Sequence, residues 1–582
     1  MAITRKWQAA HARLLNRVHA RLAARAKPAN GFVSQPEPRT IGYFARGRQM
    51  MAGNLMFAGH LVEADGRIPW QIDAPDAAFA EELQGFAWLD DLAAVGDAKA
   101  RGLAQDWLWG WIDAYGHGRG PGWTPELAGR RVIRWVHHAL FLLRGQDADK
   151  ARKYYQALAA QTQFLAKRGG SAAPGLARIE AMTGLLYAGL SLEGMETHID
   201  PARQALGREC ARQVDEAGGI PTRNPEELLE VFTLLTWAQA ALEEAGHDPD
   251  PDHLSAIRRI APTLRTLRHA DGGLARFHGG GKGLDGRLDQ ALAASGIKKR
   301  QPDGLAMGFA RLSAGRTSVI VDAAKPPSGL ASSNAHASTL GFELTSGRRQ
   351  VIVNCGSGSG FGEDWRRAGR ATLSHSTLCL QGYSSARLAN PRWDGTANRE
   401  YLEDAPTHVP VQMNAGAQAH RFEGGQDGYA RHQGLTHARS LELSLDGRSL
   451  SGEDYLVALD DAGKKRFDKA MDRAKLGGIA YEIRFHLHPE VDVAVDMGGT
   501  AASLALRSGE IWVLRFDGAV EMALMPSVYL EKGRLRPRAT QQIVLSGRAM
   551  QYATRVRWSL AKAQDTAIAV RDFARDEVDV NV

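Results

Sequence analysis

Cysteine is scarce in this sequence, and long apolar runs are missing. The 582 residues include three cysteines, Cys210, Cys355 and Cys379. An odd, sparse set in so long a chain argues against a disulfide framework. No run of about 18 apolar residues occurs, so we expect no transmembrane helix. Because residues 1–30 also lack the continuous apolar stretch of a secretory signal, the sequence predicts a cytoplasmic protein.

Acidic residues are missing from the first thirty positions. That segment carries seven positive charges, which equals the net charge of +7, so the rest of the chain is close to neutral. This distribution argues against a nucleic-acid partner, for which a basic face on the folded domain would be expected. The seven cations are Arg5, Lys6, Arg13, Arg17, Arg21, Arg25 and Lys27.

The same segment has apolar residues at helical spacing, and we predict that residues 1–40 form a basic, amphipathic N-terminal arm. Two interpretations remain open. The apolar side can pack on the chain's own helices, or it can lie on an anionic membrane surface, as arginine-rich amphipathic helices do. The apolar residues are Trp7, Leu14, Leu15, Val18 and Leu22.

The apolar periodicity changes near residue 300. Before it, segments such as RRVIRWVHHALFLL and PEELLEVFTLLTWAQAALEEAG have helical spacing. After it, short alternating segments such as TSVIVDAA and RQVIVNCG are typical of antiparallel strands in a sandwich. Helices first and strands afterwards indicate two domains. We predict a helical domain over 41–300, a β-sandwich domain over 301–565 and a tail over 566–582, with the boundary within 296–304.

A glycine-rich segment, GSGSG at 356–360, follows one of the predicted strands. A glycine-rich turn after a strand can hold a phosphate. Here the order is not G-x-G-x-x-G, and the next residues do not resemble a crossover helix. We predict instead that these glycines leave space for another domain or a ligand to approach.

Several segments, taken in order, resemble the heparinase II/III-like proteins. They are NAHASTLGFEL, RRQVIVNCGSG, WRRAGRATLSHSTLCLQG and LTHARSLELSLDGRSLSGED, within residues 316–560. The resemblance implies an incomplete (α/α) toroid followed by an antiparallel β-sandwich, with a cleft between them. It also implies a polysaccharide lyase that acts on uronate-containing glycans, which makes the periplasm or cell envelope an alternative location.

The resemblance further implies a metal site in the sandwich, often zinc, built from His, Asp and His. The matching positions in this sequence are His336, Asn354 and His375. Two imidazoles can hold zinc, but a neutral amide is a poor ligand for it. Zinc is therefore one expectation, and two histidines whose polar atoms are satisfied in the cleft are the alternative.

Cleavage of a uronate chain by β-elimination needs three groups: one that neutralises the carboxylate, a base for the C5 proton and an acid for the departing oxygen. For the first role we consider Arg178 and Arg223, because an arginine fork pairs with a carboxylate. Asn224 could share this role. His336 or His375 could be the base, since imidazole titrates near neutrality.

Tyr187 or Glu227 could supply the remaining proton. In the resembling family a catalytic tyrosine is usual near the segment that matches TRNPEELL, and Glu227 stands close to its position here. Each of these candidates has a structural alternative. The two arginines can pair with Glu180 and Glu226, Asn224 can cap a helix, and Tyr187 can belong to the core.

Four further residues are candidates for holding the sugar. His278 lies in the glycine-rich segment RFHGGGKG, near the predicted boundary, and Arg370 precedes the SHST segment. Trp111 and Trp123 belong to a tryptophan cluster. Flat rings can stack on sugars, but buried aromatic rings usually only pack.

The sequence leaves three functions open. The first is a lyase that cleaves an acidic poly- or oligosaccharide between the two domains. The second is a glycan-binding protein on the same fold that has lost catalysis, as the Asn at position 354 and the missing tyrosine suggest. The third is a toroid-type glycoside hydrolase, which needs two carboxylates about 5–10 Å apart. Its candidates would be Glu180, Glu226 and Glu227.

Overall fold

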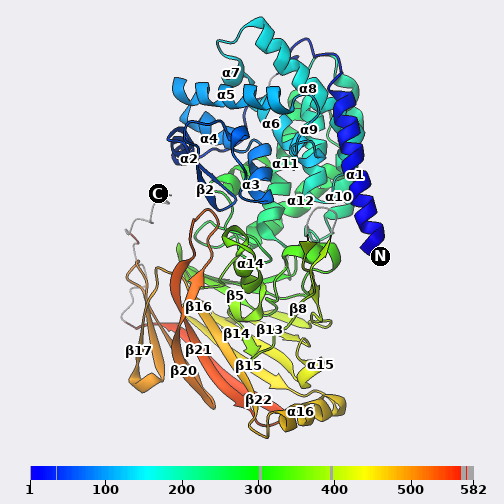
Figure 1. The fold of residues 1–582 in the computed structure, drawn as a ribbon. Coiled ribbons are helices and arrows are strands. Elements are labelled where there is room, and N and C mark those ends of the chain that lie inside the picture. Colours follow the sequence, from blue (N-terminus) through cyan, green and yellow to red (C-terminus); the bar gives the residue numbers. More distant parts are fainter. Residues whose placement is uncertain (1, 35, 300–303, 394–397, 565–571, 573–582) are drawn as a thin grey trace.

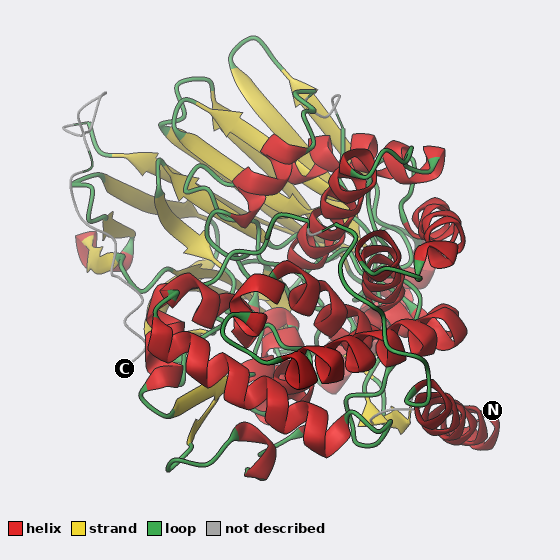
Figure 2. Cartoon of the chain, turned by 90° about the horizontal axis from the view of Figure 1, so that it is seen from above, coloured by secondary structure: helices red, strands yellow, loops and turns green. Residues whose placement is uncertain are grey.

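The computed structural model describes residues 2–34, 36–299, 304–393, 398–564 and 572. The N-terminal half of the protein is helical, and the C-terminal half is built around two antiparallel sheets (Figure 1). Seen from above, the strands fan out on one side of the helices (Figure 2). Among the described residues, no helix is long and apolar enough to cross a membrane.

The helical half forms one apolar core. Its helices begin where the sequence provides caps: Asp97 and Asp147 each accept a hydrogen bond from the N–H three residues further on, and Pro125 takes the first position of its helix. The helices are α1 (Ala2–Ala23), α2 (Phe44–Met51), α3 (Ala77–Gln84), α4 (Trp88–Val95), α5 (Ala98–Tyr115), α6 (Pro125–His137), α7 (Ala139–Leu143), α8 (Ala148–Arg168), α9 (Leu176–Ser191), α10 (Ile199–Gln213), α11 (Pro225–Glu244), α12 (Pro251–Thr266) and α13 (Arg287–Ala294). A hairpin of β1 (Asn54–Phe57) and β2 (His60–Glu63) follows α2.

Helices α6 and α9 approach each other through two glycines. A Cβ atom on Gly129 of α6 would lie 2.3 Å from the carbonyl oxygen of Glu180, and one on Gly184 of α9 would lie 2.5 Å from the Cα atom of Gly129. No side chain fits at either position, so the two backbones pack directly against each other.

The N-terminal helix α1 lies on the outside of the helical half, along α8 (Figure 1). Ala20 and Ala23 are buried on its inner side. The Nε atom of Arg168 donates to Asn16 over 2.7 Å, and Gln156 donates to the carbonyl oxygens of Ala24 and Ala26. One side of the predicted arm therefore packs on the protein's own helices.

The two sheets of the C-terminal half pack face to face. Phe342 and Trp558, one from each sheet, stack with ring centroids 5.8 Å apart in the core between them. The first sheet has the order β12 (Val411–Ala415), β13 (Ala419–Gln426), β14 (Thr436–Ser444), β15 (Ser449–Val457), β22 (Ala553–Lys562), β19 (Ile511–Asp517), β18 (Ala501–Ala505) and β17 (Asp492–Asp496). The second has the order β20 (Val520–Tyr529), β21 (Arg538–Ala549), β16 (Ile479–Leu487), β6 (Arg349–Val353), β5 (Phe342–Ser346), β4 (Thr317–Asp322) and β3 (Phe309–Ala314), with β7 (Leu378–Leu380) paired to β16.

Smaller elements border the sandwich. Along the first sheet, the buried residues of β14 alternate with partly exposed ones, as expected for a strand with one face toward a core. The smaller elements are α14 (Glu363–Arg370), α15 (Ala430–Gln433), α16 (Asp461–Arg473), the pair β8 (Arg387–Leu388) and β11 (Leu402–Glu403), and the pair β9 (Arg392–Trp393) and β10 (Asn398–Arg399).

The predicted domain boundary, residues 296–304, lies between α13 and β3, and its residues 300–303 are outside the described part of the chain. The predicted tail, residues 566–582, lies outside it as well, apart from residue 572. These bounds therefore remain predictions.

The GSGSG segment follows β6, which pairs antiparallel with both β5 and β16, so it does not belong to a βαβ unit. A short helix, α14, does follow it, which the sequence pattern did not predict. In the turn between β1 and β2, a Cβ atom on Gly59 would lie 2.0 Å from the carbonyl oxygen of Gly360. The glycines thus let the helical half approach the sandwich closely.

Candidate functional site at the junction of the two halves

Two of the predicted histidines meet at the junction. The Nδ1 atom of His336 lies 3.0 Å from the Nε2 atom of His375, and the Nδ1 atom of His375 lies 2.8 Å from the carbonyl oxygen of Ala371. A carbonyl only accepts, so Nδ1 of His375 carries a proton and its Nε2 accepts one from Nδ1 of His336. This order leaves Nε2 as the unprotonated nitrogen of His336.

A third histidine extends this cluster toward the helical half. The backbone N–H of His336 donates to Nδ1 of His278 over 3.2 Å, and Nε2 of His278 lies 3.4 Å from Asp322 at the end of β4. The hydroxyl of Ser338 donates to the same carboxylate over 2.6 Å. Asp322 therefore stands at the centre of the contacts between the halves.

Burial governs the charge of these histidines. It lowers the pKa of His278 and of His336 well below the ordinary value, and it lowers the pKa of His375 to about 4. Neighbouring positive charges act in the same direction on His278 and His336. The three imidazoles are therefore neutral at pH 7.

Arg223 joins the halves through its whole guanidinium group. Nε donates to the carbonyl oxygen of Met307, Nη1 to those of Ala324 and Lys325, and Nη2 to Gly308 and to the carboxylate of Asp322, which is 2.6 Å away. A guanidinium has five N–H donors, and these five acceptors use all of them. Arg223 is thus a structural link with no donor left for a substrate carboxylate.

Asn354 and the two histidines do not form a zinc site. The amide oxygen of Asn354 accepts from the backbone N–H of Ser376 over 2.9 Å, and its amide nitrogen lies 3.4 Å from Glu343. The lone pair of His375 already accepts from His336. Two of the three expected donor atoms are therefore engaged within the protein, and the remaining donor set does not fit zinc. No described cluster of three His, Cys, Asp or Glu side chains could hold a metal.

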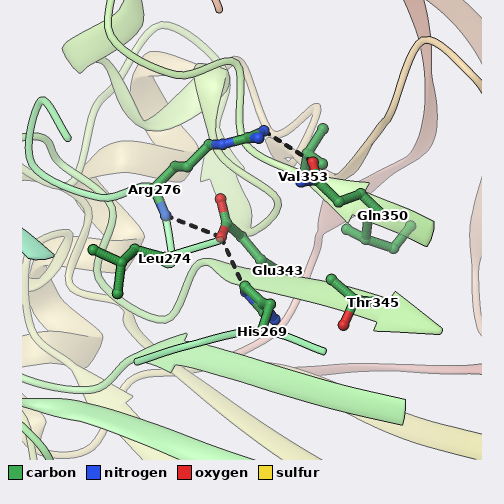
Figure 3. A pocket seen from close by; sticks show the side chains of 8 residues that line it. His269, Leu274, Arg276, Glu343, Thr345, Gln350 and Val353 are labelled. Carbon is green, nitrogen blue, oxygen red and sulfur yellow. Dashed lines mark hydrogen bonds and ion pairs between the residues drawn. The ribbon is translucent and has the colours of Figure 1, made fainter. Parts of the chain in front are cut away.

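Glu343 lines a small pocket beside Asn354 (Figure 3). Its Oε2 atom lies 3.2 Å from Nε2 of His269 and accepts from the backbone N–H of Arg276, whose side chain bonds to Gln350. The volume of this pocket, about 10 Å³, has room for one water molecule and not for a sugar.

Arg178 and Tyr187 lie on α9, and their contacts are inside the helical half. Nη1 of Arg178 donates to Glu209 over 3.0 Å, and Nε and Nη2 donate to the carbonyl oxygen of Ala172. The hydroxyl of Tyr187 donates to the carbonyl oxygen of Trp237, and burial raises the pKa of Tyr187. Tyr187 is a core residue, and Arg178 pairs with Glu209 instead of Glu180.

Asn224 is a helix cap, which is the structural alternative that the sequence left open. Its side-chain oxygen caps α11 by accepting from the backbone N–H groups of Glu226 and Glu227. The pKa values of the two glutamates beside this cap shift in opposite directions. Burial, followed by the charge of Glu180, raises the pKa of Glu227. Burial opposes the shift of Glu226, yet the ammonium group of Lys532 lowers the pKa of Glu226 overall.

The remaining sugar-binding candidates are buried. Trp111 is fully buried and donates to Gln84, and Trp123 donates to the carbonyl oxygen of Tyr115. Neither ring presents a face for a sugar. Arg370 donates to three carbonyl oxygens and thereby holds the segment before His336 in place; burial lowers the pKa of Arg370 to about 10. The acceptors are those of Ser332, Ala335 and Glu400.

Comparison with known proteins identifies the family of this chain. Residues 296–559 match the model of a protein family described as heparinase II/III-like, C-terminal. FtsZ-localized protein C from Caulobacter vibrioides (strain NA1000 / CB15N) is 31% identical over 556 residues, which cover 92% of this chain and 91% of that protein. The chain belongs to the heparinase II/III-like family.

Solved structures of heparinase II/III-like enzymes share the architecture. A crystal structure of heparinase III matches with a TM-score of 0.68 and 14% identity, over 93% of this chain and 88% of that one. A mutant of heparan sulfate lyase HepC from Pedobacter heparinus matches with a TM-score of 0.56 and 14% identity, over 95% of this chain and 88% of that one. These matches confirm the predicted fold class, a helical toroid followed by a β-sandwich.

Asp322 and Ser338, which the sequence analysis did not single out, are central to the junction. A signal was present for Asp322, since an aspartate ends the apolar run TSVIVD. A carboxylate at the end of a buried strand needs partners. Nothing in the sequence indicates that those partners are Arg223 and His278, because long-range contacts leave no local pattern.

Proposed function

We propose that this heparinase II/III-like protein binds an acidic glycan at the junction of its halves and does not cleave it by β-elimination. Family membership and the shared fold support a polysaccharide-related function. The proposed absence of cleavage rests on Arg223, whose five N–H donors are all engaged by acceptors of the protein. A lyase must neutralise the uronate carboxylate before the C5 proton can leave, and Arg223 and Arg178 are both held by the protein's own acceptors.

The proton-transfer candidates support the same conclusion. Tyr187 is enclosed in the helical core, and its raised pKa opposes ionisation. His336 keeps an unprotonated nitrogen, yet a base alone cannot remove a C5 proton whose acidity nothing has increased. The geometry therefore favours recognition of the sugar over chemistry on it.

Cations that remain exposed at the junction provide the binding surface. They flank the glycine-rich loop 278–283. At one end a Cβ atom on Gly279 would lie 3.2 Å from Asn334, which contacts Arg366 of α14. At the other end a Cβ atom on Gly281 would lie 3.2 Å from the side chain of Lys532. The neighbouring Arg367 is 57% exposed and pairs with Glu400, and Lys532 is 43% exposed and pairs with Glu226. Both cations reach solvent, where a glycan carboxylate would compete with these ion pairs.

The experiment combines an activity assay with a binding assay. Purified protein is incubated with heparan sulfate, alginate and polygalacturonate, and the absorbance of the unsaturated product is followed beside a heparinase control. Affinity for the same polymers is measured by isothermal titration. We expect no unsaturated product and measurable binding to at least one polymer. Arg367→Ala with Lys532→Ala should weaken that binding roughly tenfold, because two charge contacts at exposed sites together contribute about 1.4 kcal/mol.

A matched control removes two exposed cations at the far end of the sandwich, Lys465→Ala with Lys469→Ala on α16. It should bind like the unchanged protein. Unsaturated product would contradict the loss of cleavage, and new reducing ends without unsaturation would favour the hydrolase. Equal weakening by both double variants would contradict binding at the junction, and no binding to any of the three polymers would contradict the glycan function.

A second function comes from the relative that matches along almost the whole chain. FtsZ-localized protein C resembles both halves of this protein, including the helical half that the family model does not match. We therefore also propose that this protein is found with FtsZ in the cell. Co-sedimentation with polymerised FtsZ, compared with unpolymerised FtsZ, tests the proposal; a protein that stays in the supernatant in both samples would contradict it.

A further inference from the structure

The outer side of α1 carries an apolar stripe that the described part of the chain leaves uncovered. Trp7 is 74% exposed, Leu14 56%, Val18 43% and Leu22 55%. Their spacing of seven, four and four residues places them along one line of a helix. Large apolar side chains normally avoid such continuous exposure, and an exposed apolar stripe marks an interaction surface.

A basic stripe runs beside the apolar one. Arg13, Arg17 and Arg21 each stand one position before an apolar residue of the stripe, and all three are exposed, as is Arg25 in the turn after the helix. Arg13 also lies over the ring of Trp393, with 5.7 Å from its Cζ atom to the ring centroid. The two stripes together give α1 an outer face that is apolar along one line and cationic along the next.

The third side of α1 fixes the helix to the body of the protein. Buried alanines and the hydrogen bond between Arg168 and Asn16 hold it along α8. The helix is therefore already formed, and its outer face is presented without an ordering cost.

We propose that this outer face of α1 binds an anionic lipid bilayer, with the apolar stripe in the headgroup region and the arginines on the lipid phosphates. Helices with an apolar line and flanking arginines bind membranes in this orientation, and each cation near an anionic surface strengthens binding about fivefold. A second copy of the chain fits poorly, because two such faces would bring together two segments that each contain seven cations and no carboxylate. The lipid surface supplies the missing negative charge.

The inference is independent of the proposed glycan function, since α1 and the junction cations are different surfaces. The test uses the full chain and vesicles of phosphatidylethanolamine with phosphatidylglycerol, and of phosphatidylcholine alone, in a sedimentation assay at several salt concentrations. We expect binding to the anionic vesicles, weak binding to the neutral ones, and a decline as salt increases.

Two double variants separate the contributions of the stripes. Leu14→Glu with Leu22→Glu should lower the bound fraction at least roughly tenfold, because it places charges in the apolar stripe. Arg17→Gln with Arg21→Gln should weaken binding roughly tenfold or more and reduce its salt dependence. Thermal unfolding by circular dichroism checks that both variants fold, as expected for exposed positions.

The matched control places two glutamates at exposed leucines far from α1, Leu459→Glu with Leu476→Glu. It should bind vesicles like the unchanged protein, and so should Arg367→Ala with Lys532→Ala, whose defect would concern glycans only. Equal binding to neutral and anionic vesicles, or no effect of the glutamates in α1, would overturn the proposal. A dimer in solution that these glutamates dissolve, without any vesicle binding, would identify a second copy as the occupant.

Discussion

At the scale of single residues, Arg223 shows how a residue with the chemistry of a catalytic group can be used for structure. The same fork that would recognise a carboxylate in a substrate here holds Asp322, together with four backbone carbonyl groups. Its backbone has φ of 49°, in the left-handed region that residues other than glycine rarely adopt. Side-chain contacts across the junction compensate for that strain.

Replacement of Arg223 by alanine should destabilise the protein by about 3–5 kcal/mol, because it leaves the fully buried carboxylate of Asp322 without its cation. Urea unfolding followed by tryptophan fluorescence measures the change. Arg203→Ala is the control, since its partner Asp200 is 71% exposed and such an ion pair contributes less than about 1 kcal/mol. A similar small effect at both positions would show that Arg223 is not a structural link.

How far the sequence could predict the site differs among these residues. His336 and His375 stand in segments that resemble the family, and the structure brings them together. The role of Arg223 could not be read from the sequence, because its carboxylate partner is 99 positions away. Tyr187 has the pattern of any buried helix residue, so its enclosure in the core depends on packing that composition does not encode. The capping role of Asn224 could be predicted from the sequence, since Asn-Pro before an apolar helix is a capping pattern.

At the scale of elements, the helical half depends on a direct backbone contact between α6 and α9. Both glycines of this contact lie in helix interiors, where glycine is normally unfavourable relative to alanine. The close approach explains why they are tolerated. Helices and strands were predictable from periodicity, whereas this contact was not, because a glycine in a helical segment gives no sign of what lies against it.

Gly129→Ala should therefore destabilise the protein by about 1–3 kcal/mol, since the added methyl group meets the backbone of α9. The matched control is Gly102→Ala in α5, where nothing lies within 4 Å of the added Cβ atom. That change should stabilise the helix by up to about 1 kcal/mol. Thermal unfolding of the two variants should shift in opposite directions, and a parallel shift would argue against the close contact.

At the scale of the whole molecule, the two halves are joined by buried polar side chains. His278, His336, Asp322 and Arg223 come from both halves and contact one another, with Nε2 of His278 3.4 Å from Asp322. Such a junction is costly when one partner changes its charge. The stability of the joined molecule should therefore depend on pH.

The sign follows from the lowered pKa values of the buried histidines. The unfolded chain binds protons near pH 6.5 and the folded protein only at lower pH, so stability is full above about pH 7 and falls as the pH decreases. For His375, with a pKa of about 4 when folded, the loss between pH 7.5 and pH 5 is about 2 kcal/mol. Urea unfolding across this range measures it. His375→Gln should flatten the dependence, whereas His432→Gln, at an exposed position, should leave it unchanged.

The attachment of α1 determines how the protein would be oriented on a bilayer. The helix runs lengthwise along the flank of the elongated body, and its lower end lies beside the junction (Figure 1). Arg13 reaches the ring of Trp393, which belongs to the other half. A bilayer that receives the outer face of α1 would therefore meet the protein along its side. The long axis of the molecule would be parallel to the membrane surface, and both the helical half and the sandwich would be close to the same leaflet.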